Sequence, residues 1–258
     1  MDFFKYQGTG NDFVLIDDRD GSFPRNNQAL IEQLCHRRFG IGADGLILLQ
    51  NDPDYDFRMV YFNADGAEGS MCGNGGRCIV RFAHDLGVFE HETRFIAVDG
   101  EHTAVVSDTD ILLKMSDVSE IEDRRGLTYL NTGSPHVVRF VDELESLDVV
   151  AEGRAIRYDP AFPGGTNVNF AQVLDDHTVY VRTYERGVED ETYSCGTGVT
   201  AVALVARQQH SMPDPVAIQT IGGNLRVSFN AVADNNKQFN TIYLIGPAKQ
   251  VYAGTITI

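Results

Sequence analysis

The chain has 258 residues, of which 43% are hydrophobic and 22% are charged, and its formal net charge at pH 7 is −16. It contains no apolar run of about 18 residues, which excludes a membrane-spanning helix, and its start has neither the basic residues nor the apolar stretch of a signal peptide. The acidic balance and the lack of a basic block argue against nucleic-acid and membrane partners. We therefore expect a cytoplasmic protein whose cysteines are reduced.

The first half of the chain predicts mostly strands, with two helices. Asn26 or Asn27 is a suitable N-cap and Gly40 a suitable stop for a helix over residues 27–39, and the run 78–86 predicts a second helix. Alternating or fully apolar runs that are bounded by turn residues predict strands. These strands are residues 13–17, 45–50, 57–63, 95–98, 102–106 and 111–115.

The second half repeats this plan. A helix is predicted over residues 197–208, and the predicted strands are residues 137–141, 168–173, 178–184, 216–220, 224–229 and 241–245. Each half is thus expected to be a mixed sheet or barrel wrapped around a central helix, which makes the fold class α+β. The charged stretch near residues 117–125 is the expected boundary, so that the domains are residues 1–117 and 118–245.

Two cysteines begin the same short motif in the two halves. Cys72 precedes Gly-Asn-Gly, Cys195 precedes Gly-Thr-Gly, and 123 residues separate them. Glycines elsewhere recur at the same or nearly the same spacing, which indicates an internal duplication seen through positions where the backbone conformation matters. The recurring pairs are Gly8 with Gly133, Gly42 with Gly165, and Gly100 with Gly223.

The position of these two cysteines predicts their chemistry. A thiol at the start of a helix lies beside unpaired backbone N–H groups and the positive end of the dipole, which lowers its pKa. Two such thiols in duplicated settings favour a symmetric task, and inversion of a carbon centre needs two equal acid/base groups. No motif for pyridoxal phosphate, zinc or nucleotide binding is present, so we expect neither cofactor nor metal. The other cysteines, Cys35 and Cys78, are expected to be buried thiols inside helices.

Five motifs resemble those of the diaminopimelate epimerase family, in the same order and over nearly the whole chain. They are Gly8-Thr9-Gly10-Asn11-Asp12-Phe13, Phe62-Asn63-Ala64-Asp65-Gly66, Cys72-Gly73-Asn74-Gly75-Gly76-Arg77, Tyr184-Glu185-Arg186-Gly187 and Cys195-Gly196-Thr197-Gly198. The resemblance implies two pseudo-symmetric domains with the active site in the cleft between them. It also implies a last strand, about residues 246–258, that returns to the first domain.

The activity implied by the resemblance is that of an isomerase. It would convert LL-diaminopimelate to meso-diaminopimelate, a step in lysine and cell-wall precursor biosynthesis, with Cys72 and Cys195 as the catalytic acid/base pair. The expected partner is therefore a small-molecule diamino diacid. In the family, the positions that match His136 and Glu185 also modulate the pKa values of the cysteines.

The substrate-binding residues are expected from the needs of a diamino diacid. Arg186 can hold the distal carboxylate in a two-pronged bond, and Glu185 can attract an ammonium group. Backbone N–H groups at the two helix starts suit the α-carboxylate; they belong to Gly73, Asn74, Gly196 and Thr197. Amides would orient the polar ends without adding net charge, and they belong to Asn11, Asn63 and Asn167.

Two further binding positions depart from the family pattern. Asp44 stands where glutamine is common, and Ser134 stands where asparagine is common. A carboxylate at position 44 suits an ammonium group better than an amide does, whereas a serine at position 134 is shorter and can reach a substrate through water. Both departures concern the finer contacts and leave the reaction type unchanged.

Three alternatives stay open. A proline or hydroxyproline racemase shares the two-thiol logic, although a histidine usually follows Cys-Gly there and Asn74 takes that place here. Another amino-acid epimerase on the same scaffold would differ only at the residues that bind the distal end. A thiol hydrolase would leave the second cysteine unexplained, and a non-catalytic binding relative would be expected to have lost a cysteine, whereas both are present. The sequence is also compatible with a homodimer and does not say which thiol serves which stereoisomer.

Overall fold

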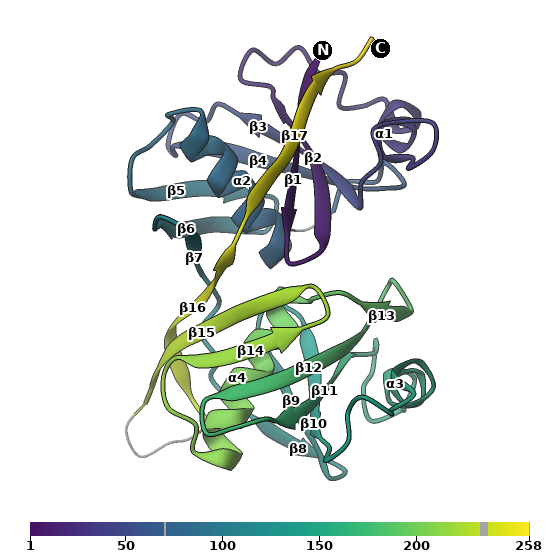
Figure 1. Cartoon of the computed structure of the whole chain (residues 1–258), viewed down its shortest axis with the longest axis vertical. Coiled ribbons are helices and arrows are strands. Elements are labelled where there is room, and N and C mark those ends of the chain that lie inside the picture. Colours follow the sequence, from purple (N-terminus) through teal and green to yellow (C-terminus); the bar gives the residue numbers. More distant parts are fainter. Residues whose placement is uncertain (70, 233–236, 258) are drawn as a thin grey trace. The chain divides into compact units, whose positions relative to one another are not determined.

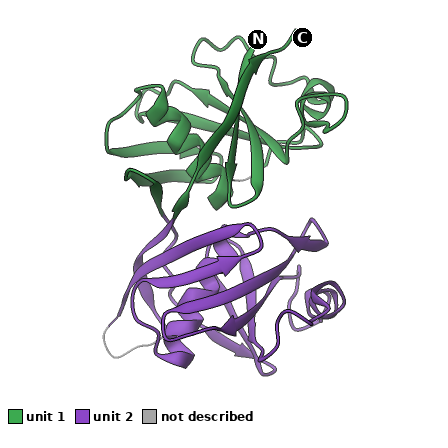
Figure 2. Cartoon of the chain, viewed as in Figure 1, with its two compact units in different colours: residues 1–113, 246–258 green, residues 114–245 purple. Residues whose placement is uncertain are grey.

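The protein is described from a computed structural model, in which residues 1–69, 71–232 and 237–257 are described (Figure 1). The chain forms two compact units, one of residues 1–113 with 246–258 and one of residues 114–245 (Figure 2). Within the described ranges, no helix is long and apolar enough to cross a membrane. The fold is α+β, as predicted. Each unit has a sheet of parallel and antiparallel strands that packs around a central helix.

The first unit combines residues from both ends of the chain. Its helices are α1 (Gln28–Cys35) and α2 (Gly73–Asp85). Its strands are β1 (Asp2–Gly8), β2 (Asn11–Asp17), β3 (Gly45–Gln50), β4 (Phe57–Asn63), β5 (Glu92–Ala97), β6 (Gly100–Val106), β7 (Asp110–Lys114) and β17 (Lys249–Thr255).

The strands of the first unit follow one another in the sheet, with β17 added at the outside of β1. The pairs β1–β2, β3–β4, β5–β6 and β6–β7 are antiparallel, whereas β2–β3 and β4–β5 are parallel. β17 runs antiparallel to β1, so that Thr255 lies opposite Asp2 and Lys249 lies opposite Gln7. The C-terminal segment therefore completes a sheet that begins at the N-terminus.

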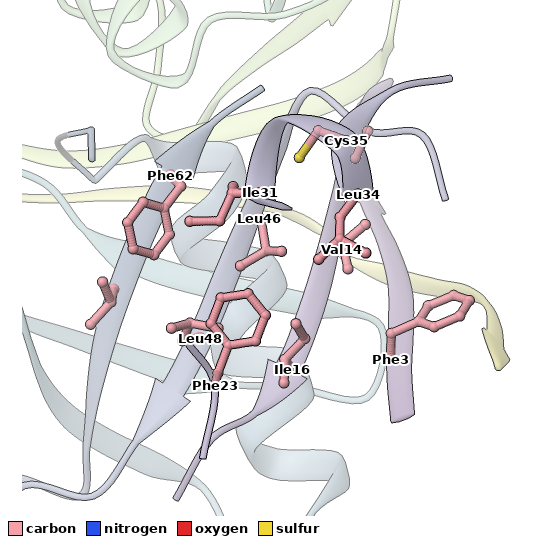
Figure 3. Close-up of a cluster of buried hydrophobic side chains, with 12 residues drawn as sticks. Phe3, Val14, Ile16, Phe23, Ile31, Leu34, Cys35, Leu46, Leu48 and Phe62 are labelled. Atoms are coloured by element: carbon pink, nitrogen blue, oxygen red, sulfur yellow. The ribbon is translucent and has the colours of Figure 1, made fainter. Parts of the chain in front are cut away.

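The central strands of this sheet are buried on both faces. On one face, Val14, Ile16, Leu46 and Leu48 form a cluster with Ile31 and other side chains of α1 (Figure 3). Side chains alternate along a strand, so their neighbours point to the other face, where α2 packs. Ile47 of β3 and Met59 of β4 accordingly lie against Gly75 of α2. Burial on both faces explains why β2 and β3 are continuous apolar runs in the sequence.

The second unit has the same order of elements. Its helices are α3 (Val149–Arg157) and α4 (Gly196–His210). Its strands are β8 (Glu122–Arg124), β9 (Leu127–Asn131), β10 (Pro135–Phe140), β11 (Asn167–Val173), β12 (Thr178–Glu185), β13 (Asp190–Thr192), β14 (Val216–Thr220), β15 (Gly223–Ala231) and β16 (Phe239–Pro247), the last of which continues past residue 245.

The pairing of these strands repeats that of the first unit, which confirms the predicted pseudo-symmetry. The pairs β9–β10, β11–β12, β14–β15 and β15–β16 are antiparallel, whereas β10–β11 and β12–β14 are parallel. β8 lies antiparallel to β9, as β17 does to β1. α4 packs against these strands as α2 does in the first unit, and α3 covers the other face of β11 and β12.

The observed elements differ from the predicted ones at their ends and in five elements that were not predicted, namely β1, β8, β9, β13 and α3. Strands 45–50, 57–63 and 216–220 match residue for residue, and Asn27 caps α1 as expected, with its side chain accepting from Leu30 N–H at 3.2 Å. α1 ends at Cys35 because the chain folds back, and a Cβ on Gly40 would lie 1.9 Å from the Gln33 carbonyl oxygen. α3 was not predicted, because Gly153 interrupts its apolar pattern.

Candidate active site

Cys72 is the N-cap of α2, and its side chain takes part in the cap. The sulfur accepts a hydrogen bond from the backbone N–H of Gly75 at 3.2 Å. A Cβ on Gly75 would lie 3.2 Å from that sulfur, so the glycine leaves room for the thiol to fold over the first turn. Anions are stabilised at this end of a helix by unpaired N–H groups and by the dipole. The local geometry therefore favours the thiolate of Cys72.

Asn74, in the first turn of α2, joins the helix start to the turn between β1 and β2. Its Nδ2 donates to Oδ1 of Asn11 at 3.4 Å, and its Oδ1 accepts from Oγ1 of Thr9 at 3.4 Å. Nη2 of Arg77 donates to the same Oδ1 at 3.1 Å. Two predicted site residues, Asn11 and Asn74, are thus held together beside Cys72.

The carboxylate of Asp44 has protein partners on both oxygens. Oδ1 accepts from Nη2 of Arg37 at 2.6 Å, and Oδ2 accepts from Nδ2 of Asn11 at 2.6 Å. Arg37 also forms a two-pronged pair with Asp12, at 2.9 and 2.7 Å. Burial alone would raise the pKa of Asp12, but hydrogen bonds from Arg37 and Lys5 outweigh it and hold that pKa well below its usual range. In this arrangement Asp44 orients the amide of Asn11.

Asn63 and Gly73 complete the predicted residues of the first unit. Asn63 is exposed at the end of β4 and lies opposite Gly45, the residue that follows Asp44, at the same edge of the sheet. Gly73 is the first residue of α2, and its carbonyl oxygen accepts from Nη1 of Arg77 at 3.2 Å. Gly73 therefore lies on the helix that Cys72 caps, while Asn63 lies on the strand that pairs with the residue after Asp44.

Cys195 is the N-cap of α4, the position that Cys72 has in α2, and its relative exposure is 9%. Its sulfur lies 3.5 Å from Oγ1 of Thr197. The same hydroxyl oxygen lies 2.8 Å from Nε2 of His136 and 3.2 Å from Oγ of Ser134. A chain of polar contacts thus leads from the buried histidine to the thiol.

The partners of His136 define its tautomer. Nδ2 of Asn169 lies 3.1 Å from Nδ1 of His136, and an amide nitrogen can only donate, so Nδ1 carries no proton. The amide is fixed in this orientation because its Oδ1 accepts from Oγ1 of Thr183 at 3.0 Å and its Nδ2 donates to the Val137 carbonyl at 2.9 Å. The proton of the neutral ring is therefore on Nε2, where it faces Thr197.

His136 is neutral at physiological pH. Its side chain is completely buried, and this burial, followed by the positive charge of Arg186, lowers its pKa from 6.5 to about 3. A neutral imidazole with its proton on Nε2 donates one hydrogen bond toward the hydroxyls of Thr197 and Ser134. The ring therefore influences Cys195 through these hydroxyls and not through a charge.

Asn167 connects the remaining predicted residues of the second unit. Its Nδ2 donates to Oγ of Ser134 at 3.3 Å, and its Oδ1 accepts from the backbone N–H of Arg186 at 2.8 Å. The side chain of Arg186 is exposed, and its Nη1 donates to the carbonyl oxygens of Gly164 and Gly165, each at 3.4 Å. Glu185, at the end of β12, is half-buried. The guanidinium is thus positioned with donors left for an anion.

Cys35 and Cys78 differ chemically from Cys72 and Cys195. Cys35 packs in the apolar cluster under α1, and burial raises the pKa of its thiol to about 11. Cys78 is fully buried in α2, and burial raises its pKa still further. Both are therefore protonated thiols at neutral pH, as buried cysteines usually are.

Sequence reasoning missed three residues of these clusters. Asn169 is a buried amide in the apolar strand β11, and a polar residue in such a run is itself a signal that was not used. Thr9 was noted only as part of a motif, and Arg77 only as the end of one. Their roles depend on contacts between distant segments, which the spacing of residues along the chain does not reveal.

The two clusters have the groups that proton transfer needs. Each unit places a thiol at a helix start, with backbone donors and uncharged amides around it. Among the residues that the structure describes, no three His, Cys, Asp or Glu side chains are grouped as metal ligands. The thiols at the helix starts can carry out acid/base or nucleophilic chemistry at sulfur.

Comparison with known sequences gives a single family over the whole length. A family model described as diaminopimelate epimerase matches residues 3–119 and 128–251. The chain is 50% identical over 259 residues to a diaminopimelate epimerase of Flavobacterium psychrophilum, with 99% of this chain and 100% of that protein covered. It is 38% identical to a diaminopimelate epimerase of Aquifex aeolicus, with 100% and 98% covered.

Solved structures show the same fold at low sequence identity. A PhzF-family phenazine biosynthesis protein of Bacillus anthracis has a TM-score of 0.77 at 15% identity, with 100% of this chain and 99% of that chain covered. A probable proline racemase of Agrobacterium radiobacter has a TM-score of 0.68 at 15% identity, with 100% and 93% covered. At such identities the likeness concerns the fold alone.

Proposed function

The chain belongs to the diaminopimelate epimerase family, and from this premise we propose that it interconverts LL- and meso-diaminopimelate with Cys72 and Cys195 as its two acid/base groups. One observation supports this proposal most strongly. In two units of the same topology, a cysteine occupies the N-cap of the central helix and is followed by a glycine. A duplicated thiol is what a reaction at the two faces of one carbon atom requires.

The reaction consists of one proton removal and one proton delivery. A thiolate takes the α-proton, the electron pair is stabilised on the α-carbon and its carboxylate, and the thiol of the other cysteine supplies a proton to the opposite face. The configuration is inverted, and the two cysteines end with their protonation states exchanged. An α-proton is far less acidic than any side chain, so stabilisation of the carbanion is the main demand on the site.

The helix starts are suited to this demand. Backbone N–H groups in the first turn of a helix have no carbonyl partner within the helix, and the dipole adds partial positive charge. The groups that we expect to bind the α-carboxylate are the N–H groups of Gly73, Asn74, Gly196 and Thr197. Charge that develops in the transition state would then meet donors that are already in place.

The distal carboxylate of the substrate needs a cationic side chain, and the distal ammonium group needs an anionic side chain or an amide. Arg186, exposed and fixed through its backbone N–H by Asn167, is the expected ligand of the distal carboxylate. Glu185 is expected to attract the distal ammonium group and to modulate the cysteines together with His136. Asn63 and Asn167 would orient the polar ends.

Asp44 and Ser134 are expected to act mainly through their neighbours. Asp44 holds the amide of Asn11, while Ser134 lies 3.0 Å from Nε2 of His136 and 3.2 Å from the Thr197 hydroxyl. Their effect on binding would therefore be transmitted by Asn11 and by the histidine–threonine pair. A place in lysine and cell-wall precursor biosynthesis and a cytoplasmic location belong to the same proposal.

The proposal is tested by α-deuterium uptake in D2O over a panel of amino acids. The purified protein should label LL-diaminopimelate and convert it to the meso form, while lysine and proline, which lack the distal amino-acid end, should exchange poorly. Binding energy from that end is needed to align the thiols with the α-carbon. A preference for proline over diaminopimelate would overturn the substrate assignment and leave the two-thiol chemistry in place.

A further inference from the structure

Arg77 of α2 is a completely buried arginine close to the start of the helix. Nη1 donates to the Gly73 carbonyl at 3.2 Å, and Nη2 donates to Oγ1 of Thr9 at 3.0 Å and to Oδ1 of Asn74 at 3.1 Å. Nε donates to the Pro247 carbonyl at 3.4 Å. The guanidinium therefore ties together the helix start, the β1–β2 turn and the returning C-terminal segment.

These four acceptors are all uncharged oxygens. Within the described residues, no carboxylate lies at ion-pair distance from Arg77. A buried cation without an anionic partner is costly, so a negative charge nearby would be strongly favoured. Burial lowers the pKa of this guanidinium, and the charges that oppose the lowering are those of Cys78, Cys72 and Asp110.

Cys72 is the member of this group that is built to become an anion. Cys78 is fully buried, and burial raises its pKa far above neutrality, so it remains a thiol. Asp110 is on β7, and of the three groups it has the smallest effect on the pKa of Arg77. Cys72 already accepts a hydrogen bond from Gly75 N–H at the helix start. Its thiolate would meet both the dipole and the charge of Arg77.

The second unit has no such cation at the matching position. Thr200 is the fifth residue after Cys195, as Arg77 is the fifth after Cys72. Its Oγ1 donates to the Gly196 carbonyl at 2.9 Å, just as Arg77 donates to the Gly73 carbonyl. The hydrogen bond is therefore duplicated, but the charge is not.

Two basic residues of the second unit belong to the cluster around His136, and neither is a buried cation. His136 is neutral, and Arg186 is exposed to solvent and follows Glu185, a group of opposite charge. Exposed charges are screened by water, whereas a completely buried one is not. Cys195 thus lies beside the Thr197 hydroxyl, and an uncharged threonine, Thr200, takes the position of the buried Arg77.

Resting on the proposed function, we propose that Arg77 is a positioning residue that makes the two cysteines unequal, so that the substrate-free protein holds Cys72 as thiolate and Cys195 as thiol. Two-base inversion needs one protonated and one ionised thiol at the start of each turnover. Two identical thiols would populate this state in two mirror forms and would also populate the forms with both or neither ionised. A fixed charge beside one of them selects a single form.

The test is the pH dependence of alkylation of each cysteine by iodoacetamide in the substrate-free protein, resolved by peptide mass spectrometry. The midpoint of each profile reports ionisation, whereas exposure changes only its height. We expect a lower midpoint for Cys72 than for Cys195 in the unmodified protein. Arg77→Met should raise the Cys72 midpoint by roughly 1–3 pH units, the usual effect of losing an opposite charge nearby. Arg77→Lys, which keeps the charge, should restore most of the shift.

Other charges near α2 set the controls for this experiment. Arg77 and Cys78 of α2 and Tyr6 of the packed strand β1 interact with further titratable or charged groups, which are Cys72, Asp110, Asp12, Asp85 and Arg81. Arg81 lies one turn further along α2 and donates to the Ser107 carbonyl at 3.1 Å. Arg81→Met is therefore the matched loss of a positive charge, and it should leave the Cys72 midpoint in place.

Three outcomes decide the inference. In the unmodified protein, equal alkylation midpoints for the two cysteines, or a lower midpoint for Cys195, would overturn the inference. This comparison does not require the Arg77→Met variant to fold. An unchanged Cys72 midpoint in a cooperatively folded Arg77→Met variant would also overturn it. Because the assay contains no substrate, a wrong substrate assignment would leave its result unaffected, and the two failures can be told apart.

Discussion

The hydroxyl oxygen of Thr197 lies 3.5 Å from the sulfur of Cys195, and on its other side it lies 2.8 Å from Nε2 of His136. Since the neutral ring carries its proton on Nε2, it donates to Thr197, and the threonine hydroxyl keeps its own proton to donate to a thiolate on Cys195. One hydroxyl thus connects a buried ring to a thiol at the helix start. A thiolate on Cys195, as the proposed mechanism requires, would be stabilised by this arrangement.

Thr197→Val tests this connection. The substitution removes the hydroxyl at nearly constant volume and keeps the backbone N–H, so kcat should fall with little change in KM. A hydrogen bond to a charged group contributes about 1.5–3 kcal/mol, which corresponds to a fall of roughly 10- to 150-fold. Thr200→Val in the same helix is the control, because the Thr200 hydroxyl donates to the Gly196 carbonyl of its own helix. Equal losses for the two variants in steady-state kinetics would contradict the role of Thr197.

His136 makes the stability of the fold depend on pH. Its folded pKa of about 3 lies below the ordinary value of 6.5. Between these pH values the unfolded chain binds a proton that the folded chain excludes, so this contribution to stability is complete above pH 6.5 and is lost as the pH falls. Urea titrations from pH 7 to 5 should show a slope of up to about 1.4 kcal/mol per pH unit from this residue.

His136→Gln should make that slope shallower, whereas His91→Gln, at an exposed histidine, should not. The comparison separates His136 from the carboxylates, which titrate mostly at lower pH. A slope that is the same in the unmodified protein and in the His136 variant would show that the ring is not buried in its neutral form.

Asn169 should control the tautomer of His136. Because its Nδ2 faces Nδ1 of the ring at 3.1 Å, ¹⁵N spectra of the protein should show the proton on Nε2. Asn169→Asp replaces the donor by an acceptor, so the proton should move to Nδ1 and kcat should fall. An unchanged tautomer in the Asp variant would mean that Asn169 does not set the orientation of the ring.

Arg186 should determine specificity for the distal carboxylate. Arg186→Ala is expected to lower kcat/KM for diaminopimelate by about 2–3 kcal/mol, or roughly 30- to 150-fold, as the loss of a charge-assisted pair does. Arg139→Ala is a matched control, because Arg139 forms an ion pair with Glu152 at 3.0 Å on the surface. If both variants retain full kcat/KM, Arg186 does not bind the substrate.

Much of the fold could be predicted because its signals are local. The apolar strand 45–50 and the helix that follows Cys195 are defined by runs of residues that are buried on all sides. α3 was missed because Gly153 looks like a helix breaker, yet a Cβ there would lie 2.4 Å from Cβ of Tyr184, so the glycine is required for packing against β12. That requirement belongs to a contact between distant segments.

The candidate site shows the same division. Cys72 and Cys195 stand out in the sequence because glycines follow them and the motif is repeated. The attachment of Asp44 to Arg37, and of Asn169 to His136, depends on which strands pair and on side-chain orientation. Residue type and spacing could therefore identify the thiols but not the groups that orient their neighbours.

The central claim is that inversion needs both thiols. Chiral analysis of diaminopimelate, starting separately from the LL and the meso isomer, should show that Cys72→Ala and Cys195→Ala each lose epimerisation in both directions, by roughly 10²–10⁴-fold or more. Both variants should still unfold cooperatively, and Cys35→Ala, at a buried thiol outside the mechanism, should keep its activity. Substantial epimerisation by either Cys72→Ala or Cys195→Ala would contradict the two-base mechanism.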